Sequence, residues 1–198
     1  MKLRIGLLFA AGLLTTQLVW AAEYKIGKEH TTVGFKIRHL FSWVQGSFNE
    51  FEGHFSYDPD HPEMWKAEAT IQAKSIDTHV EKRDNHLRSA DFFDIEKFPT
   101  LTFKSTAVHE ANKTSAKLDG MLMIHGVEKP VTLDLEIHGA GKDPWGNFLA
   151  GFTATTKINR KDFGLSWNQA VETGQLLVGE EVLITLEIEG ILQEQPKQ

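Results

Sequence analysis

The sequence contains no cysteine among its 198 residues. Disulfides, thiolate nucleophiles and cysteine-ligated metals are therefore excluded, and export to an oxidising compartment would leave the hydrophobic core to hold the fold alone. Tyrosine is also scarce, because two tyrosines stand against 13 phenylalanines and five tryptophans. Most of the aromatic rings thus lack a hydroxyl group and favour apolar surroundings.

Positive charge is in the minority. The 21 Lys and Arg residues against 27 Asp and Glu residues give a formal net charge of −6. A nucleic-acid partner requires a basic surface, so we expect none. The same balance disfavours electrostatic docking onto an anionic membrane.

Long hydrophobic runs are missing except near the start of the chain. The basic segment Met1–Arg4 precedes an apolar run over residues 5–14. This run is shorter than the ~20 residues that span a bilayer, but it suits a secretory signal. Cleavage after Ala21 fits better than cleavage after Ala22, which would place bulky Trp20 where a small side chain is preferred.

The sequence therefore predicts a signal peptide over residues 1–21 and one domain over residues 22–198. Removal of the signal leaves 177 residues with a formal charge of −8, because Lys2 and Arg4 are lost. That length suits one hydrophobic core. No second long apolar run follows, so we expect no stable insertion into a membrane.

An alternation of apolar and polar residues dominates the remaining chain. It is clearest over residues 33–39, 67–73, 131–137 and 182–188. A period of two with one wet face is typical of antiparallel strands. Further strands are predicted over residues 47–57, 101–108, 117–124 and 148–158, and a change of parity after Phe48 indicates a bulge.

A short helix is expected to interrupt these strands. Thr78 and Glu81 have the spacing of a capping box, and Asp84 and Arg88 can pair along one helical face. About eight strands favour a closed barrel, because closure removes exposed sheet edges. The predicted fold is all-β with a short helical insertion, in the form of a single antiparallel eight-stranded β-barrel.

Several motifs resemble those of the YceI-like family. Around the expected helix these are Ile76-Asp77-Thr78, residues 83–94 (RDNHLRSADFFD), Phe98-Pro99 and Phe103, and elsewhere they are residues 33–40, 46–48, 51–53, 125–131, 160–164 and 178–182. They follow one another in order over nearly the whole of residues 22–198. The resemblance implies a lipocalin-like barrel in the bacterial periplasm that binds a polyisoprenoid or a similar long lipid.

The barrel interior is the expected ligand site. An eight-stranded barrel can pack solid with its rings or hold one small ligand, and a face of small residues (Ala67, Ala69, Ala73) opposite Phe-rich strands can leave a slot. Ten buried methylene groups would contribute about 8 kcal/mol before ordering costs, so a hydrocarbon tail needs no polar anchor. We expect the slot to be lined by Phe35, Ile37, His39, Phe48, Phe92, Phe93, Phe103, Met121, Met123, Phe152 and Trp167.

Polar residues near the helix could bind a ligand head at the barrel rim. Arg83, His86 and Arg88 could hold a phosphate or carboxylate, whereas nearby acids could neutralise the arginines instead. Arg83 and Asp91 are expected to pair at the rim. Because Phe92 and Phe93 are adjacent, one should point into the barrel while the other packs the helix onto it.

Two functions remain open. The first is a non-catalytic carrier of a polyisoprenoid or isoprenoid quinone, which requires no cofactor and exists as a monomer or homodimer. The second is a periplasmic hydrolase or isomerase acting on such a lipid, for which His86 with Asp91 could supply acid–base chemistry. The sequence has no Gly-x-Ser-x-Gly elbow. The nine histidines show no metal-binding pattern, so no metal is expected.

Overall fold

The computed structural model describes residues 21–170, 174 and 176–193. The predicted signal peptide lies outside this part of the chain except for Ala21, and it stays a prediction.

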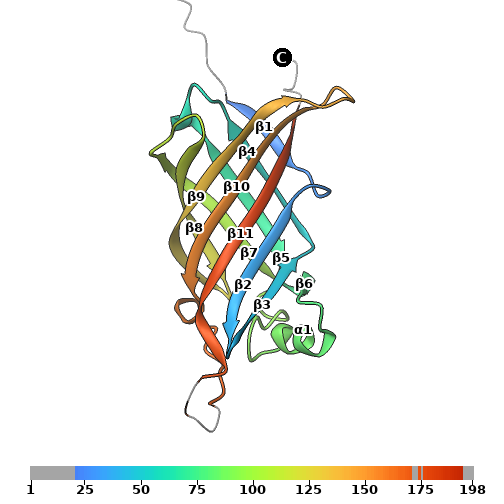
Figure 1. The fold of residues 1–198 in the computed structure, drawn as a ribbon, viewed down its shortest axis with the longest axis vertical. Coiled ribbons are helices and arrows are strands. Elements are labelled where there is room, and N and C mark those ends of the chain that lie inside the picture. The colour runs from blue at the N-terminus through green and yellow to red at the C-terminus, as the bar shows by residue number, and fades with distance from the viewer. Residues whose placement is uncertain (1–20, 171–173, 175, 194–198) are drawn as a thin grey trace, which may run out of the picture.

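Eight strands close into an antiparallel barrel (Figure 1). In spatial order they are β1 (Ala22–Ile26), β4 (Phe51–Tyr57), β5 (Lys66–Gln72), β7 (Thr100–His109), β8 (Ser115–Ile124), β9 (Val127–Lys142), β10 (Phe148–Asn159) and β11 (Val178–Leu192). The ring is complete because β11 returns to β1, where Tyr24 faces Leu192. The predicted closed antiparallel eight-stranded barrel is confirmed, although the sequence did not predict β1.

Three further strands extend the wall at one end of the barrel. β2 (Thr32–His39) takes the place of β1 beside the first half of β11, and β3 (Ser42–Phe48) follows β2 in a hairpin. The short strand β6 (Ile76–Asp77) pairs with the end of β3.

The predicted strand over residues 47–57 is in fact two strands. β3 ends at Phe48 and β4 begins at Phe51, so the change of parity marks an interruption rather than a bulge. The two residues between them bond elsewhere, since the Asn49 N–H donates to Ser75 C=O and Glu50 C=O accepts from Gln72 N–H. Phe48 and Phe51 are both buried on either side of this break.

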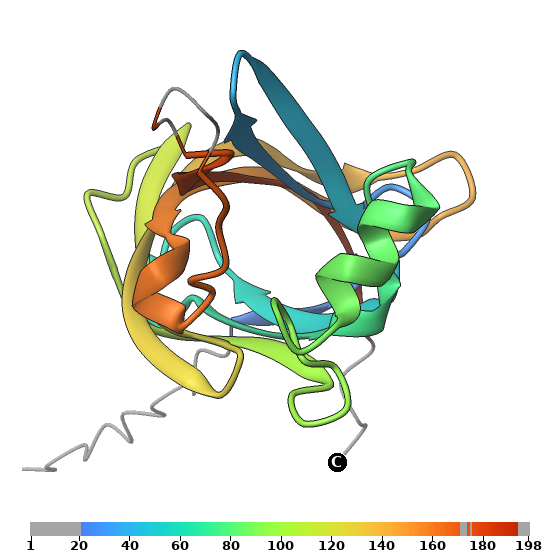
Figure 2. The same ribbon diagram turned by 90° about the horizontal axis from the view of Figure 1, so that it is seen from below.

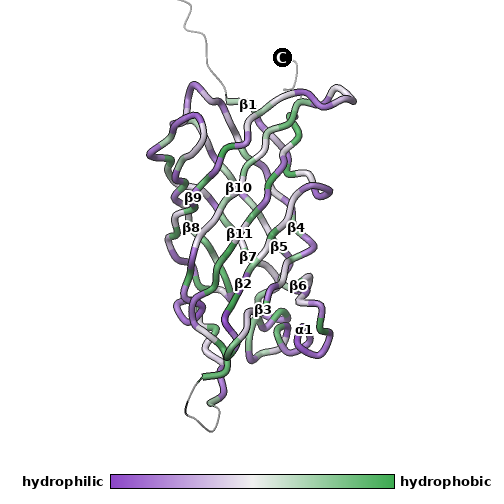
Figure 3. The backbone as a smooth tube through the Cα atoms, viewed as in Figure 1, coloured by the Kyte–Doolittle hydropathy of each residue, from purple (hydrophilic) through white to green (hydrophobic). Residues whose placement is uncertain are grey.

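The helices of the described part are short. They are the 3-10 turns η1 (Pro62–Met64), η2 (Ala73–Ser75) and η3 (Arg160–Phe163), and one α-helix, α1 (Glu81–Arg88). The ribbon shows α1 at the same end as the β2–β3 hairpin, and Figure 2 shows η3 on the other side of that end. The tube of Figure 3 shows α1 as a mostly hydrophilic segment.

The expected capping box is absent from α1. Val80 occupies the N-cap position, and no side chain caps the helix there. Thr78 instead donates its backbone N–H and its hydroxyl to the buried carboxylate of Asp84. The expected pair of Asp84 with Arg88 is therefore also wrong, because Thr78, six residues earlier in the chain, has taken the carboxylate.

Candidate functional site

A large cavity fills much of the barrel interior. Its volume is about 910 Å³, near the upper end of the range for small-molecule sites. Figure 2 shows the barrel from the end that carries α1 and η3. Inward residues of the long strands form most of the wall, including Leu118, Leu133 and Leu186. Most lining residues are aliphatic or aromatic, so the cavity suits a hydrocarbon.

Most of the residues predicted to bind the ligand lie on the cavity wall. They are Phe35, Ile37, His39, Phe48, Phe92, Phe93, Phe103, Phe152 and Trp167. Whether they contact a ligand stays a prediction.

Met121 and Met123 do not line the cavity, so their predicted placement is wrong. Buried and half-buried residues alternate along β8, and the buried positions near these methionines are Leu122 and Ile124. Adjacent side chains on a strand point to opposite faces, so both methionines lie on the outer face.

The sequence prediction also omitted many wall residues. Val131, Leu133 and Leu135 from β9 and Val182, Ile184, Leu186 and Ile188 from β11 line the cavity. Their alternation with polar residues was a sufficient signal, because a single inward parity places every second side chain in the interior.

A cluster of packed aromatic rings lies at the end of the cavity away from α1. Tyr24 stacks on Phe55 at 5.1 Å between ring centroids, and Phe55 meets Phe152 edge-on at 5.3 Å. Tyr57 packs against both Trp65 and Phe152 at 4.8 and 5.0 Å. All five rings are buried. They form a floor that a ligand entering from the other end would meet.

A second group of rings lies at the cavity mouth. The His86 imidazole of α1 contacts Phe92 at 5.1 Å and Trp167 at 4.8 Å between centroids, and Phe92 contacts Trp167 at 5.2 Å. These three residues join α1 to the chain that follows η3. The mouth is thus bordered by two segments about 80 residues apart in sequence that meet only in the folded barrel.

Phe92 and Phe93 diverge, but both line the cavity. Phe92 packs within the mouth group, and Phe93 meets Phe48 edge-on at 5.7 Å between centroids. Phe92 thus packs against α1 and Phe93 against a barrel residue, in agreement with the expected division, except that Phe92 also lines the cavity. The turn after α1 places both rings at the rim of the barrel, where a side chain can contact the helix and the cavity at the same time.

The polar residues predicted for the rim divide into two groups. Arg83 and His86 line the cavity, whereas Arg88 and Asp91 do not. The expected Arg83–Asp91 pair is absent. Arg83 donates from Nε to the Thr78 hydroxyl and from Nη2 to Thr78 C=O, both at 2.7 Å. Asp91 accepts from His86 Nε2 at 2.9 Å.

Arg88 fastens α1 to the barrel wall. Its Nε donates to Lys74 C=O and its Nη2 to Ile76 C=O, each at 2.7 Å, while Nη1 donates to the Asn85 side chain at 3.0 Å. With all three nitrogens engaged in this way, Arg88 has a structural task rather than the predicted role in head binding.

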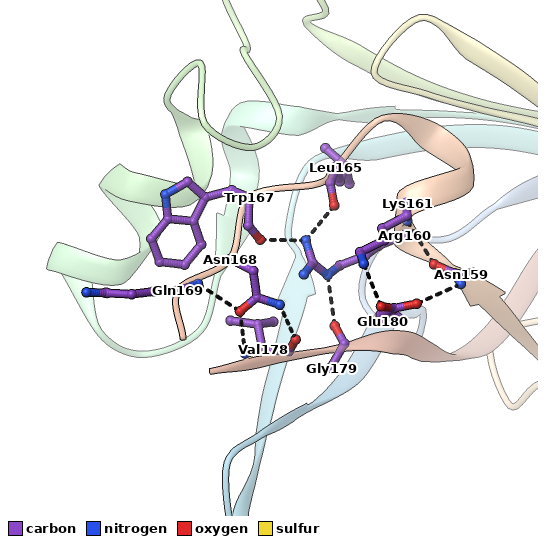
Figure 4. A network of polar contacts seen from close by, with 10 residues as sticks. All are labelled: Asn159, Arg160, Lys161, Leu165, Trp167, Asn168, Gln169, Val178, Gly179 and Glu180. Carbon is purple, nitrogen blue, oxygen red and sulfur yellow. Dashed lines mark hydrogen bonds and ion pairs between the residues drawn. The ribbon is translucent and has the colours of Figure 1, made fainter. Parts of the chain in front are cut away.

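Arg160 organises the other side of the mouth (Figure 4). It is 3% exposed and lines the cavity. Its guanidinium donates to the carbonyls of Gly179, Leu165 and Trp167. These bonds hold the chain after η3 against β11 and so position the Trp167 ring at the mouth. Nη2 is buried, and it has no hydrogen-bond partner among the described residues.

Burial lowers the pKa of Arg160, and the carboxylate of Glu180 partly offsets this shift. Glu180 itself accepts from Lys161 Nζ at 2.6 Å, which is the main reason that its pKa lies below the usual range. The sequence places Arg160 in a family motif but does not predict it as a site residue. Arg160 directly follows β10 with the same parity as the inward Ile158, and this parity was the signal that could have placed it inside.

No group of three or more His, Cys, Asp or Glu side chains in the described ranges is arranged to hold a metal ion. None of the helices in those ranges is long and apolar enough to cross a membrane.

A closed eight-stranded antiparallel barrel around a large apolar cavity, with a helix at its mouth, defines a lipocalin-like binding barrel. The chain belongs to the YceI-like family, whose domain matches residues 24–190. Protein YceI of Salmonella agona is 43% identical over 194 residues, which cover 96% of this chain and 97% of that protein.

Solved structures of similar fold support this assignment. The YCEI protein of Campylobacter jejuni is 35% identical, with a TM-score of 0.69 over 84% of this chain and 96% of that chain. A polyisoprenoid binding domain from Saccharophagus degradans is only 13% identical, with a TM-score of 0.61 over 87% of this chain and 99% of that chain. At that identity the likeness extends to the fold alone.

Proposed function

We propose that this protein is a periplasmic carrier that holds a polyisoprenoid or a comparable long-chain amphiphile in its barrel without changing it chemically. The observation that carries the proposal is the continuous apolar cavity of about 910 Å³, with a cluster of buried aromatic rings at one end. A ligand for such a site has a long apolar body and enters from the α1 end. The fold shared with a polyisoprenoid binding domain supports this ligand class.

Apolar burial alone is sufficient for useful affinity. About ten methylene groups inside the cavity contribute roughly 8 kcal/mol before ordering costs, and an affinity in the micromolar range corresponds to about that value. The flexible tail loses conformational freedom on binding, so a longer buried tail is needed for tighter binding. An isoprenoid quinone satisfies the same requirement as a polyisoprenoid, because both have a repeated apolar tail.

A periplasmic location is supported by the basic and apolar segments at residues 1–14. Cell fractionation followed by N-terminal sequencing tests it. We expect mature protein that begins at Ala22, or at Glu23 if cleavage shifts by one residue. Uncleaved protein in the cytoplasmic fraction would contradict this part of the proposal.

One observation favours the alternative function, a hydrolase or isomerase acting on the held lipid. The His86 imidazole lines the cavity and bonds to Asp91 at 2.9 Å, and such a pair can take up and release a proton. Both side chains are partly exposed, as expected also for a pair that only fixes the mouth. The carrier needs no chemical step from this pair and is therefore preferred.

Extraction of the purified protein with organic solvent, followed by mass spectrometry, separates the two functions. We expect an intact prenyl lipid in stoichiometric amount from protein that was never exposed to added ligand. Incubation with a defined prenyl lipid should return the same compound. A product of altered mass or double-bond position that disappears in His86→Gln would identify the enzyme, and the absence of any lipid or lipid binding would refute both functions.

A further inference from the structure

Large apolar side chains are exposed around the cavity mouth. We define the mouth rim as Phe41, Trp43, Val80 and Leu176, which are 83%, 41%, 46% and 45% exposed. Phe41 lies in the turn between β2 and β3, and Val80 immediately precedes α1. Large apolar side chains exposed at one end of a domain commonly mark a contact surface.

The mouth rim is continuous with the cavity. Val80 and Leu177 both line the cavity, and Leu176 is the neighbour of Leu177. Leu40 N–H donates to Leu177 C=O at 3.0 Å, which brings the β2–β3 turn beside that segment. An apolar path therefore leads from the cavity wall to the exposed tips of the rim.

Two basic side chains lie beside Trp43 on the outer face of the β2–β3 hairpin. Lys36 Nζ and the Arg38 guanidinium lie 5.0 and 5.2 Å from the centroid of the Trp43 ring. No described carboxylate lies within salt-bridge distance of Lys36 or Arg38, in contrast to Lys104, Lys157 and Lys161. Tryptophan flanked by basic residues is the composition found where proteins meet the headgroup layer of a membrane.

We propose that the mouth rim docks onto the surface of a zwitterionic phospholipid bilayer, and that the ligand passes between bilayer and cavity through this contact. The proposal rests on the proposed function for its purpose. The hydrophobic effect that holds a long tail in the cavity equally opposes its passage through water. A mouth pressed into the headgroup layer removes that barrier, because the tail then moves from one apolar phase to another.

The chemistry of the rim favours this partner over others. Phe41 and Trp43 can insert among lipid headgroups, while Lys36 and Arg38 can contact lipid phosphates. The whole chain carries a formal charge of −6, which disfavours strongly anionic membranes and leaves zwitterionic lipid as the preferred surface.

Vesicle flotation tests the proposal with the purified protein and phosphatidylcholine vesicles. We expect the wild-type protein to float with the vesicles. The variants Phe41→Ser and Trp43→Ser should each lower the partition coefficient roughly tenfold, because full burial of a large apolar side chain changes a partition equilibrium by about that factor or more.

Trp145→Ser is the matched control. Trp145 is also 83% exposed, but it lies in the β9–β10 turn, at the opposite end of the barrel (Figure 1). Its loss should leave flotation unchanged. Circular dichroism of each variant checks the fold. Because the Phe41 side chain is exposed, we expect Phe41→Ser to leave the fold unchanged.

Several outcomes would overturn the proposal: no flotation of the wild type, equal flotation of wild type and Phe41→Ser, or an equal loss in Trp145→Ser. A homodimer in sedimentation that Phe41→Ser dissociates, without vesicle binding, would make the rim a dimer interface instead. Lipid recovery by extraction is scored separately. Retained lipid without flotation refutes only the docking surface, whereas flotation without any lipid binding refutes only the carrier.

Discussion

The ring of Phe103 on β7 lies so close to Gly120 on β8 that a Cβ atom at position 120 would collide with it. Phe103 pairs directly with Leu122, and Gly120 lies two residues before Leu122 on the same face of β8. Because the glycine has no side chain, the ring can lean along the wall instead of standing across the interior. This contact keeps the cavity wide beside a bulky wall residue.

Gly120→Val should therefore narrow the cavity. The new side chain would push the Phe103 ring inward or shift the β7 backbone, at a cost of about 1–3 kcal/mol for overpacking. Urea unfolding measures the stability, and lipid extraction measures the bound ligand, which should decrease. Gly141→Ala is the control, since no atom lies within 4 Å of a Cβ built there. Equal effects of the two substitutions would contradict the role assigned to Gly120.

Phe93→Asp should abolish lipid binding without unfolding the barrel. Phe93 lines the cavity and contacts Phe48, so the new carboxylate would face the lipid tail. An unpaired polar group against hydrocarbon costs several kcal/mol. Mass spectrometry of extracts should find no lipid, while circular dichroism keeps its strand signal. A full lipid load with unchanged thermal stability would show that the mouth lies elsewhere.

Arg160→Met should loosen the chain after η3. The variant keeps a similar apolar stem but removes the donors to the carbonyls of Gly179, Leu165 and Trp167. We expect a loss of roughly 3 kcal/mol, because buried acceptors that lose a charged donor cost about 1–3 kcal/mol each and the removed charge no longer requires desolvation. Chemical denaturation measures this loss.

Lys161→Ala is the neighbouring comparison for Arg160→Met. Its ion pair with Glu180 is largely exposed, so the loss should stay below about 1 kcal/mol. If Arg160→Met is no less stable than Lys161→Ala, the Arg160 network does not hold the mouth.

Arg88→Ala should affect ligands of every head chemistry alike. Arg88 binds the carbonyls of Lys74 and Ile76 and so attaches α1 to the wall, away from the cavity. We expect a loss of about 1–3 kcal/mol in stability. Binding of a prenyl phosphate and of a neutral prenyl quinone should weaken by similar factors. A selective loss of the phosphate would restore the head-binding role that the sequence suggested.

Acid should destabilise the protein. The His79 backbone N–H, at 2.7 Å from Asp77 Oδ1, is the main reason that the pKa of Asp77 is lowered. A hydrogen bond from the Thr132 hydroxyl, and then one from His109, lowers the pKa of Asp119. Since the unfolded chain binds these protons more readily, the contribution to stability is present above about pH 4 and is lost as the pH falls through the folded pKa values.

Thermal melts between pH 7 and pH 2 measure this dependence. The melting temperature should fall with the pH in the acid range, and Asp77→Asn should make the decline shallower. A melting temperature that rises on acidification would contradict the stabilising role assigned to these carboxylates.

Strand identity and the inward face could be predicted wherever one parity alone is apolar. Val182, Ile184, Leu186 and Ile188 alternate with mostly polar residues, and all four line the cavity. In β8 both parities carry large apolar residues near Met121 and Met123, so alternation could not decide which face is buried. The neighbouring strands decided it, because pairing with β7 and β9 places Leu122 inside.

The alternation of most strands and their aromatic-rich inward face were thus already determined by local sequence, because alternation acts over a few residues. Closure of the ring depends on the pairing of β11 with β1, a strand that the sequence did not predict. The partners of the polar residues were decided only by tertiary structure. Asp84 lies four residues from Arg88 yet accepts from Thr78, while Arg88 reaches back to Lys74. Likewise His86 and Trp167 meet at the mouth only because the barrel closes between them. Spacing along the chain predicts only which side chains could pair within one helix or strand. Buried carboxylates and backbone carbonyls bond to whichever donor the fold brings close.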